Sequence, residues 1–233
     1  MEWIRDWKER LLLINKIGVT EMDYRDEEIL KAKKEREQDE KRKENAKAQE
    51  AEAQESIYDE KIHLMGYETK FTRRDVDELK VSIYMPDEFF LLPDDVKKMV
   101  YPNGNAPSHV YGGEHIDFQL AMSQTVHKVP DNGMKEFIEI SSKMMQAIGP
   151  KITIIEKKVE EIQKENREPY HIGTLSFVSR AVDMMVFNVQ FYISINGQLL
   201  LGTIVFPSKH KKRMIKVAYE MIESIEILDD ATE

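Results

Sequence analysis

One short stretch of the chain brings together side chains of the types that bind metal ions. Residues 109–117 hold two histidines and two carboxylates, His109, Glu114, His115 and Asp117. A zinc site needs three or four such ligands converging on one point. We expect a strand over 115–124, in which His115 and Asp117 share one face while Glu114 points to the other. The sequence therefore predicts no metal site at this stretch.

Motifs that hold cofactors or nucleophiles are also missing from the sequence. The glycine-containing segments 103–105 and 112–113 lack the lysine and the strand–helix context of a phosphate-binding loop, so we predict turns there. The chain has no cysteine, which excludes a disulfide framework, a thiolate zinc site and a cysteine nucleophile. No serine stands in the frame of a nucleophile elbow. We predict no cofactor, and the pattern favours a protein that is not an enzyme.

A basic cluster begins the last predicted helix, at Lys209, Lys211, Lys212 and Arg213. Cations are unfavourable at a helix start because of the helix dipole. Two interpretations remain open: a solvated first turn, which we favour, or a surface that contacts an anionic partner. The formal net charge of −9 argues against nucleic acid as that partner, because binding to phosphate backbones depends on an excess of Lys and Arg.

The N-terminal residues 1–20 have the spacing of an amphipathic helix. Its apolar stripe comprises Trp3, Ile4, Trp7, Leu11 and Ile14, and it holds both tryptophans of the chain. The stripe docks on the chain's own globular domain or binds a protein partner or a second copy. A membrane surface is disfavoured, because the polar side mixes acids with bases. No apolar run is long enough for a secretory signal or a membrane span, so we predict a cytoplasmic protein.

A charged segment separates this helix from the rest of the chain. Charged residues make up 33% of the sequence, above the roughly 25% of average globular chains, and residues 21–55 are nearly all Glu, Lys, Arg, Gln and Ala. These residues favour helix, but only scattered alanines are available for coiled-coil core positions. We predict a charged helical spacer or linker over 21–77, in which the part at 56–77 is ambiguous and compatible with a short extended segment. A globular domain over 78–229 and a frayed tail at 230–233 follow.

The strongest signal for the fold lies between residues 172 and 207, which indicate two or three antiparallel strands. Asn196 and Gly197 both accept positive φ and predict a two-residue hairpin turn. The turn sets Ile193 opposite Leu200 and Phe187 opposite Phe206, so that one face is apolar. The other face is mixed, and its polar members are Asn188, Gln190, Tyr192 and Ser194.

Further elements flank this hairpin. Alternation predicts strands at 78–86, 109–111, 115–124 and 152–156, and apolar periodicity predicts helices from Pro93, over about 131–148, and from about Lys209. Residues 160–169 continue as a helix or form a long hairpin loop. Strand runs combined with helices that cover a sheet indicate an α+β fold with a central antiparallel sheet.

Three features of this layout resemble a known group of domains. They are the segment Ile83-Tyr84-Met85-Pro86-Asp87-Glu88-Phe89, the Lys-Met-Val-Tyr-Pro step that ends at Pro102, and the strand–Asn-Gly–strand–Pro–helix ending. Together they resemble small α/β/α sandwich domains of the PsbP-like and DcrB-like type over residues 78–227. The resemblance implies a three-layer sandwich, preceded here by the charged arm, and a group that mostly serves in assembly or binding. It transfers no functional residue, because no site motif matches.

Two hypotheses about function follow. The first is a non-catalytic interaction or assembly protein, in which a globular domain is tethered to a partner-binding N-terminal helix. The alternative is an enzyme or small-ligand-binding protein with a pocket over the mixed sheet face at Asn188, Gln190 and Tyr192. A concave pocket that gathers titratable groups would favour the alternative.

Overall fold

The computed structural model describes residues 31, 33–34, 54–148, 152–164, 168–181 and 184–228. The chain divides into two units, Met1–Ala53 and Gln54–Glu233. In the first unit, Lys31, Lys33 and Lys34 are helical and exposed. The predicted N-terminal helix over 1–20 and the tail over 230–233 lie outside the described residues.

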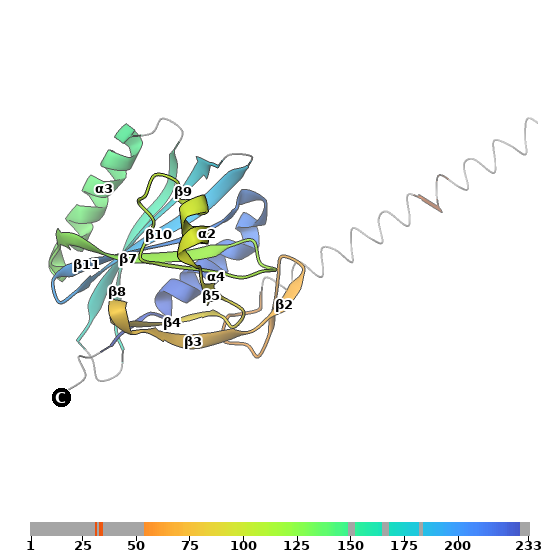
Figure 1. Ribbon diagram of the computed structural model, residues 1–233, viewed down its shortest axis with the longest axis horizontal. Helices are drawn as coiled ribbons and strands as arrows, with labels where there is room; N and C mark the ends of the chain where they lie inside the picture. Colours follow the sequence, from red (N-terminus) through yellow and green to blue (C-terminus); the bar gives the residue numbers. More distant parts are fainter. Residues whose placement is uncertain are drawn as a thin grey trace, which may run out of the picture. The chain divides into compact units, whose positions relative to one another are not determined.

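The second unit is built on a seven-stranded antiparallel sheet, and its described residues form an α+β fold (Figure 1). The strands follow the order β5-β6-β7-β11-β10-β9-β8. Their bounds are Phe90–Leu91 (β5), His109–Gly112 (β6), Gln119–Lys128 (β7), Thr153–Ile162 (β8), Tyr170–Arg180 (β9), Met185–Ile195 (β10) and Gln198–Pro207 (β11).

The predicted hairpin is confirmed, with its register. Asn196 and Gly197 have φ values of 52° and 78°, as a two-residue hairpin turn requires. Ile193 lies opposite Leu200, and Phe187 opposite Phe206. The phenylalanine rings stack with centroids 5.3 Å apart. Positive φ at both turn positions fixes the register. The register places Phe187, Phe191 and Ile193 on one face with Leu200, Ile204 and Phe206, whereas Tyr192, Leu199 and Leu201 lie on the other face.

Two smaller sheets complete the unit and overturn the predicted domain start at 78. One pairs β1 (Ile62–Leu64) with β2 (Tyr67–Thr69); the other has the order β12-β4-β3, with β3 at Phe71–Val76, β4 at Val81–Pro86 and β12 at Glu226–Ile227. Residues 54–76 therefore belong to the globular unit and not to a spacer. They contribute five side chains to the main core, Ile57, Ile62, Leu64, Phe71 and Val76. The sequence signal was weak because each of these strands is short.

Helix α4 (Lys211–Glu223) packs on the apolar face of the large sheet. Its apolar stripe is buried in the main core with Phe187, Phe191 and Phe206. The stripe comprises Met214, Val217, Ala218, Met221 and Ile222, and Ile225, which follows the helix, is buried with them as the apolar periodicity predicts. The first residues of the unit are fastened to this helix. Arg213 and Lys216 each donate a hydrogen bond to the Glu55 carbonyl at 2.8 Å, and the Ile57 amide donates to the Glu220 carboxylate at 3.0 Å.

Helix α3 (Met134–Ile148) lies on the opposite face, over β8 and β9. Met134 and Ile138 pack on Leu175 and Tyr192 in a second core. The helix approaches so closely that a Cβ on Gly173 would lie 2.6 Å from Ile138 Cγ1. The short helix α2 (Asp94–Val100) lies near β6, where Leu92, Val110 and Ala121 form a third, small core.

Two predicted strands differ from those observed. The expected strand over 115–124 starts only at Gln119, although Ile116 and Phe118 are buried as expected. The expected strand over 152–156 runs on to Ile162 as β8, which pairs antiparallel with β9 up to Ile162 opposite Tyr170. The many charges of β8 hid its length, because they leave no apolar alternation.

Candidate functional site

An apolar groove of about 420 Å³ opens on the large sheet beside α2. One wall comes from Leu92, Val96 and Val100, of which the two valines share a helix face because they are four residues apart. The other side comes from Val186 at the start of β10 and Val205 near the end of β11. Both residues lie on the sheet face that also carries α3. Val186 is two positions from Asn188 in β10, and Val205 lies directly opposite Asn188.

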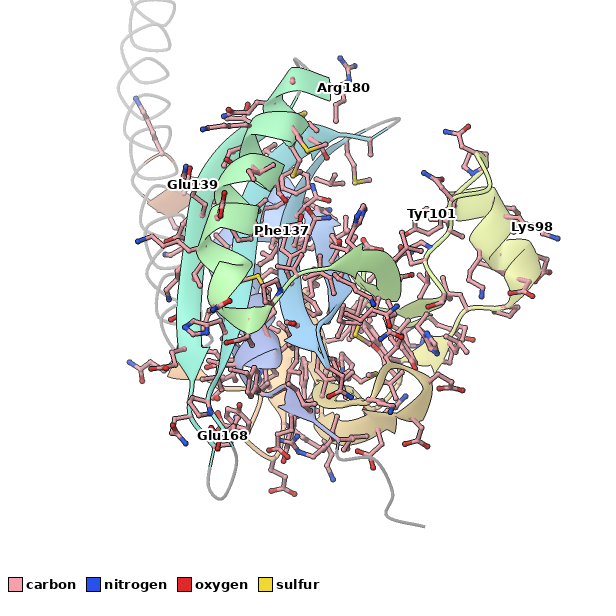
Figure 2. The ribbon with its side chains drawn as sticks, turned by 90° about the vertical axis from the view of Figure 1, so that its left-hand side faces the viewer. Lys98, Tyr101, Phe137, Glu139, Glu168 and Arg180 are labelled. Carbon is pink, nitrogen blue, oxygen red and sulfur yellow. The ribbon has the colours of Figure 1, made fainter. Side chains whose placement is uncertain are left out.

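The sequence around α2 explains why the helix forms there. Pro93 precedes the first turn, Asp94 and Asp95 occupy it, and Asp94 pairs with Lys97 at 2.8 Å. Seven residues give the helix only two turns, and its valines are left in the groove without a covering layer. Figure 2 shows Lys98 on the side of α2 that points away from the sheet.

Apolar side chains at the groove are accessible. Val100 is 43% exposed and Met184, which also lines the groove, is 51% exposed. Met99, next to Val100, is 72% exposed. Exposed apolar side chains that gather beside a groove are typical of a surface that binds another molecule.

At Asn188, Gln190 and Tyr192, where a pocket was predicted, the mixed face is instead used for internal packing and hydrogen bonds. Tyr192 is 6% exposed and lies edge-on to Phe137 of α3, with ring centroids 5.1 Å apart. Its hydroxyl donates to Gln190 Oε1 at 2.7 Å, and burial raises the pKa of Tyr192 far above its ordinary value. Asn188 donates to Ser179 Oγ at 3.0 Å. None of these three predicted residues lines the groove.

A second hollow, a polar cleft of about 580 Å³, separates the start of α3 from β8 and β9. Its most organised feature is a histidine–aspartate pair. Asp131 Oδ2 lies 2.5 Å from His171 Nδ1, and Asp131 Oδ1 accepts the backbone N–H of His171 at 2.8 Å. The carboxylate thus fixes the orientation of the imidazole, as in sites where histidine moves a proton.

Both charge signs line the cleft around this pair. Lys135, Lys157, Glu139 and Glu161 all contribute, and Lys157 pairs with Glu139 at 2.5 Å. Such a lining suits a small polar molecule that carries both hydrogen-bond donors and acceptors. No pattern in the sequence indicates this pair, because His171 and Asp131 are forty residues apart.

The predicted basic cluster is divided by the fold. Arg213 donates to the Glu55 carbonyl, and its side chain is only 13% exposed. Lys211 Nζ lies 4.9 Å from the centre of the Phe187 ring, a cation–π contact. Lys209 and Lys212 are exposed. An anion contact at these two lysines stays a prediction.

The histidine-rich stretch that was expected not to bind a metal lies in a strand and the loop after it. His109 is in β6, within 3.5 Å of Glu78, whereas His115 is in the loop and stacks on Tyr67. Among the described residues, no three His, Asp or Glu side chains gather as a metal site would require. The predicted partner-binding residues Trp3, Ile4, Trp7, Leu11 and Ile14 lie outside the described part.

No known protein family and no curated protein matches this sequence. Three solved structures are similar to the chain. Cyanobacterial PsbP (CyanoP) from Synechocystis shares 10% identity at a TM-score of 0.44, over 67% of this chain and 92% of that one. LpqN, involved in cell envelope biogenesis of Mycobacterium tuberculosis, shares 10% at 0.45, over 69% and 92%. PA94 from Pseudomonas aeruginosa, a protein of unknown function and putative regulator, shares 12% at 0.40, over 70% and 99%.

Cyanobacterial PsbP is thus among the structures to which this chain is similar, and the relation to PsbP-like domains stays a resemblance. Identities of 10–12% carry no residue-level assignment of function. In the part of the chain that the structure describes, no helix is both long and apolar enough to cross a membrane.

Proposed function

We propose that this chain is a non-catalytic interaction or assembly protein, whose globular unit binds apolar side chains of a protein partner in the groove beside α2. The observation that carries the proposal is the accessible apolar wall, with Val100 43% and Met184 51% exposed at a formed hollow. Apolar side chains that are left in water at a hollow gain free energy when a partner covers them.

The N-terminal stripe supplies a second binding element in this proposal. In the helix predicted from the sequence, Trp3, Trp7 and Leu11 share one face, and an isolated helix of this length is marginal without a surface to pack on. Two weak contacts on one chain bind more tightly together than either does alone, because the second forms at a high effective concentration. The three-layer sandwich and the cytoplasmic location expected from the sequence are part of the same proposal.

A photo-crosslinking amino acid tests the groove in the full chain within cells. Placed at Val100, it should capture a defined partner, whereas the matched control at Lys98, on the outer side of α2, should not. The captured protein is then identified, and a Met184→Glu change in the same chain should reduce its capture at least about tenfold, because it places a charge in the apolar contact. Equal capture from both positions would refute a partner site in the groove.

The N-terminal element has its own test. The double change Trp3→Ala and Trp7→Ala removes both tryptophans, and we expect it to weaken recovery of the same partner while the thermal transition of the globular unit stays within about 2 °C. Tryptophan emission of the unmodified chain should shift to the blue when the partner is added, since no other tryptophan contributes. Undiminished recovery with the double mutant contradicts the role of the stripe.

A second candidate function rests on the polar cleft. The histidine–aspartate pair in that cleft suits an enzyme or a protein that binds a small polar ligand. A panel of small acids, amines and amides should then raise the melting temperature of the unmodified chain but not that of His171→Ala. A panel without any shift counts against this candidate and leaves the groove proposal intact.

A further inference from the structure

The strand β8 forms one edge of the large sheet and leaves its backbone groups available on one side. It is ten residues long and pairs only with β9 among the described strands. Exposed edge strands of this length attract another strand, and proteins usually guard them with bulges and charges. Both devices are present in β8, since the register shifts between Ile154 and Glu156 and four charges occupy 157–161.

The charges of β8 follow an order that is not needed merely to keep other strands from pairing with this edge. Two lysines precede Val159 and two glutamates follow it, in the sequence Lys157-Lys158-Val159-Glu160-Glu161. Read in the opposite direction, the same segment presents glutamates where the first presents lysines. Such a segment is charge-complementary to an antiparallel copy of itself.

We propose that β8 binds β8 of a second copy of this chain, antiparallel and with the two-fold axis at Val159. Lys157 then lies opposite Glu161 of the second copy, and Lys158 opposite its Glu160. Since each pair occurs twice, the axis relates four opposite-charge pairs. Pairs of this kind, directly opposed across two strands, stabilise a sheet, whereas like charges destabilise it. The two large sheets become continuous, and neither edge β8 remains exposed.

Neighbouring registers are disfavoured by the same charges. In an antiparallel pair, two directly opposed residues either both point their backbone N–H and C=O groups at the partner strand or both point them away. Successive residues of one strand alternate in this direction, so a residue cannot oppose the copy of its neighbour. The two-fold axis must therefore pass through a residue position and not between two residues. An axis at Lys158 sets that lysine against its own copy and Glu156 against Glu160. An axis at Glu160 sets that glutamate against its own copy. Only the axis at Val159 matches all four charges around it.

The faces of the sheet agree with this register. Lys157 and Glu161 lie on the α3 side, where both line the polar cleft. Lys158 and Glu160 lie on the α4 side, where Lys158 Nζ is 5.8 Å from the centre of the Tyr219 ring. Opposed residues of an antiparallel pair project from the same face, so each lysine meets its glutamate on one side of the sheet.

On the α4 side, Glu160 lies near other ionisable groups, beside which the partner strand would place its Lys158. Burial, followed by the nearby charge of Glu160, raises the pKa of Glu223 above its ordinary value. Burial and the charge of Glu156 raise the pKa of Tyr219 to about 12. Within one copy, Lys158 pairs with Glu160 at 2.5 Å. In the proposed dimer a second Lys158 arrives from the partner strand at this surface.

The spacing of the helices is also compatible with the dimer. Strands lie about 4.8 Å apart, so a helix centred over β8 and β9 would lie roughly 10 Å from its copy across the axis. Helices pack at about 8–10 Å. The two α3 helices would therefore adjoin and would not overlap.

Charge reversal in the full chain tests the register. The acidic variant carries Lys157→Glu and Lys158→Glu, and the basic variant carries Glu160→Lys and Glu161→Lys. Sedimentation velocity over a concentration series should show a concentration-dependent dimer for the unmodified chain, and a dissociation constant at least about tenfold higher for each variant alone. A control with Lys70→Glu and Lys98→Glu makes the same change in net charge as the acidic variant, at exposed positions away from β8. This control should dimerise as the unmodified chain does.

Mixing the two variants separates the proposal from a general effect of charge or folding. In the mixed pair, all four glutamates of one copy meet lysines of the other, so a heterodimer should form although each variant alone stays monomeric. Circular dichroism and thermal melting check that each variant is folded before mixing. An unmodified chain that stays monomeric at every concentration, or a mixture that forms no heterodimer, overturns the proposal.

Discussion

Gly202 in β11 lies directly opposite Phe191 in β10, and the ring occupies the space where a side chain would stand. A Cβ built on Gly202 would lie 1.9 Å from Phe191 Cζ and 2.3 Å from its Cε1. Phe191 is fully buried in the main core, so its ring has no solvent-facing space to move into. We therefore expect Gly202→Ala to be strongly destabilising, although it adds a single methyl group.

The size of the effect follows from this geometry. Overpacking of a core lowers the free energy of unfolding by about 1–3 kcal/mol. Because the contact with Phe191 would lie far below van der Waals distance, we expect a loss at the upper end, about 3 kcal/mol. For a unit of this size each kcal/mol lowers the melting temperature by about 2–4 °C, which gives a drop of roughly 6–12 °C. Thermal and urea unfolding of the full chain, followed by circular dichroism, measure both quantities.

A matched control and a rescue variant make the reasoning refutable. At Gly112 the nearest atoms to a built Cβ lie 3.7 Å away, an ordinary contact, so Gly112→Ala should change stability by less than about 0.5 kcal/mol. Phe191→Leu removes the ring, and its combination with Gly202→Ala should be more stable than Gly202→Ala alone. Additive losses in the double mutant, or a loss under about 0.5 kcal/mol for Gly202→Ala, would show that the ring does not set the cost.

Three further changes test other parts of the structure by urea or thermal unfolding. Gly197→Val should cost about 1–3 kcal/mol, because a β-branched residue is strained at a φ of 78°, and a loss under about 0.5 kcal/mol would contradict the turn. Arg213→Gln should cost about 1–3 kcal/mol, because it breaks charged hydrogen bonds to the start of the unit, whereas the exposed Lys212→Gln should stay within about 0.5 kcal/mol; equal losses would refute the contrast. A fragment over 54–233 should unfold cooperatively, whereas 78–233 should not, because it lacks five core side chains; a cooperative transition in the shorter fragment would refute the boundary.

The parts of the fold that the sequence predicted correctly are those with strong local determinants. The turn at Asn196-Gly197 dictated a register of strand pairs, and each predicted pair from Phe187 to Ile195 is present. The helix stripe from Met214 to Ile222 is buried as its 3.6-residue period requires. In both cases the information is contained in a segment shorter than 25 residues.

The remaining features depend on contacts between distant segments. Two examples are the contact between Asp131 and His171 and the hydrogen bond from Arg213 to the Glu55 carbonyl. In both, no sequence periodicity connects the two residues. The interpretation of the basic cluster as a solvated first turn does not apply to Arg213, because its internal partner Glu55 lies 158 positions earlier in the chain. The polar residue Tyr192 was placed on the correct sheet face, but which part of that face α3 covers was not encoded locally.

The fastening of Glu55 to α4 also determines how the unit responds to mechanical load. Tension applied through the segment before Gln54 is received by hydrogen bonds from Arg213 and Lys216 to a single carbonyl, close to the bond between Ile57 and Glu220. These bonds share the load and must fail together, whereas a terminal strand peeled from a sheet edge loses its bonds one at a time. Arg213, Lys216 and Glu220 all belong to α4, and the apolar stripe of this helix is buried in the main core. A chain that tethers a partner through its N-terminal segment would thus transmit force into a helix whose apolar stripe is buried in the main core.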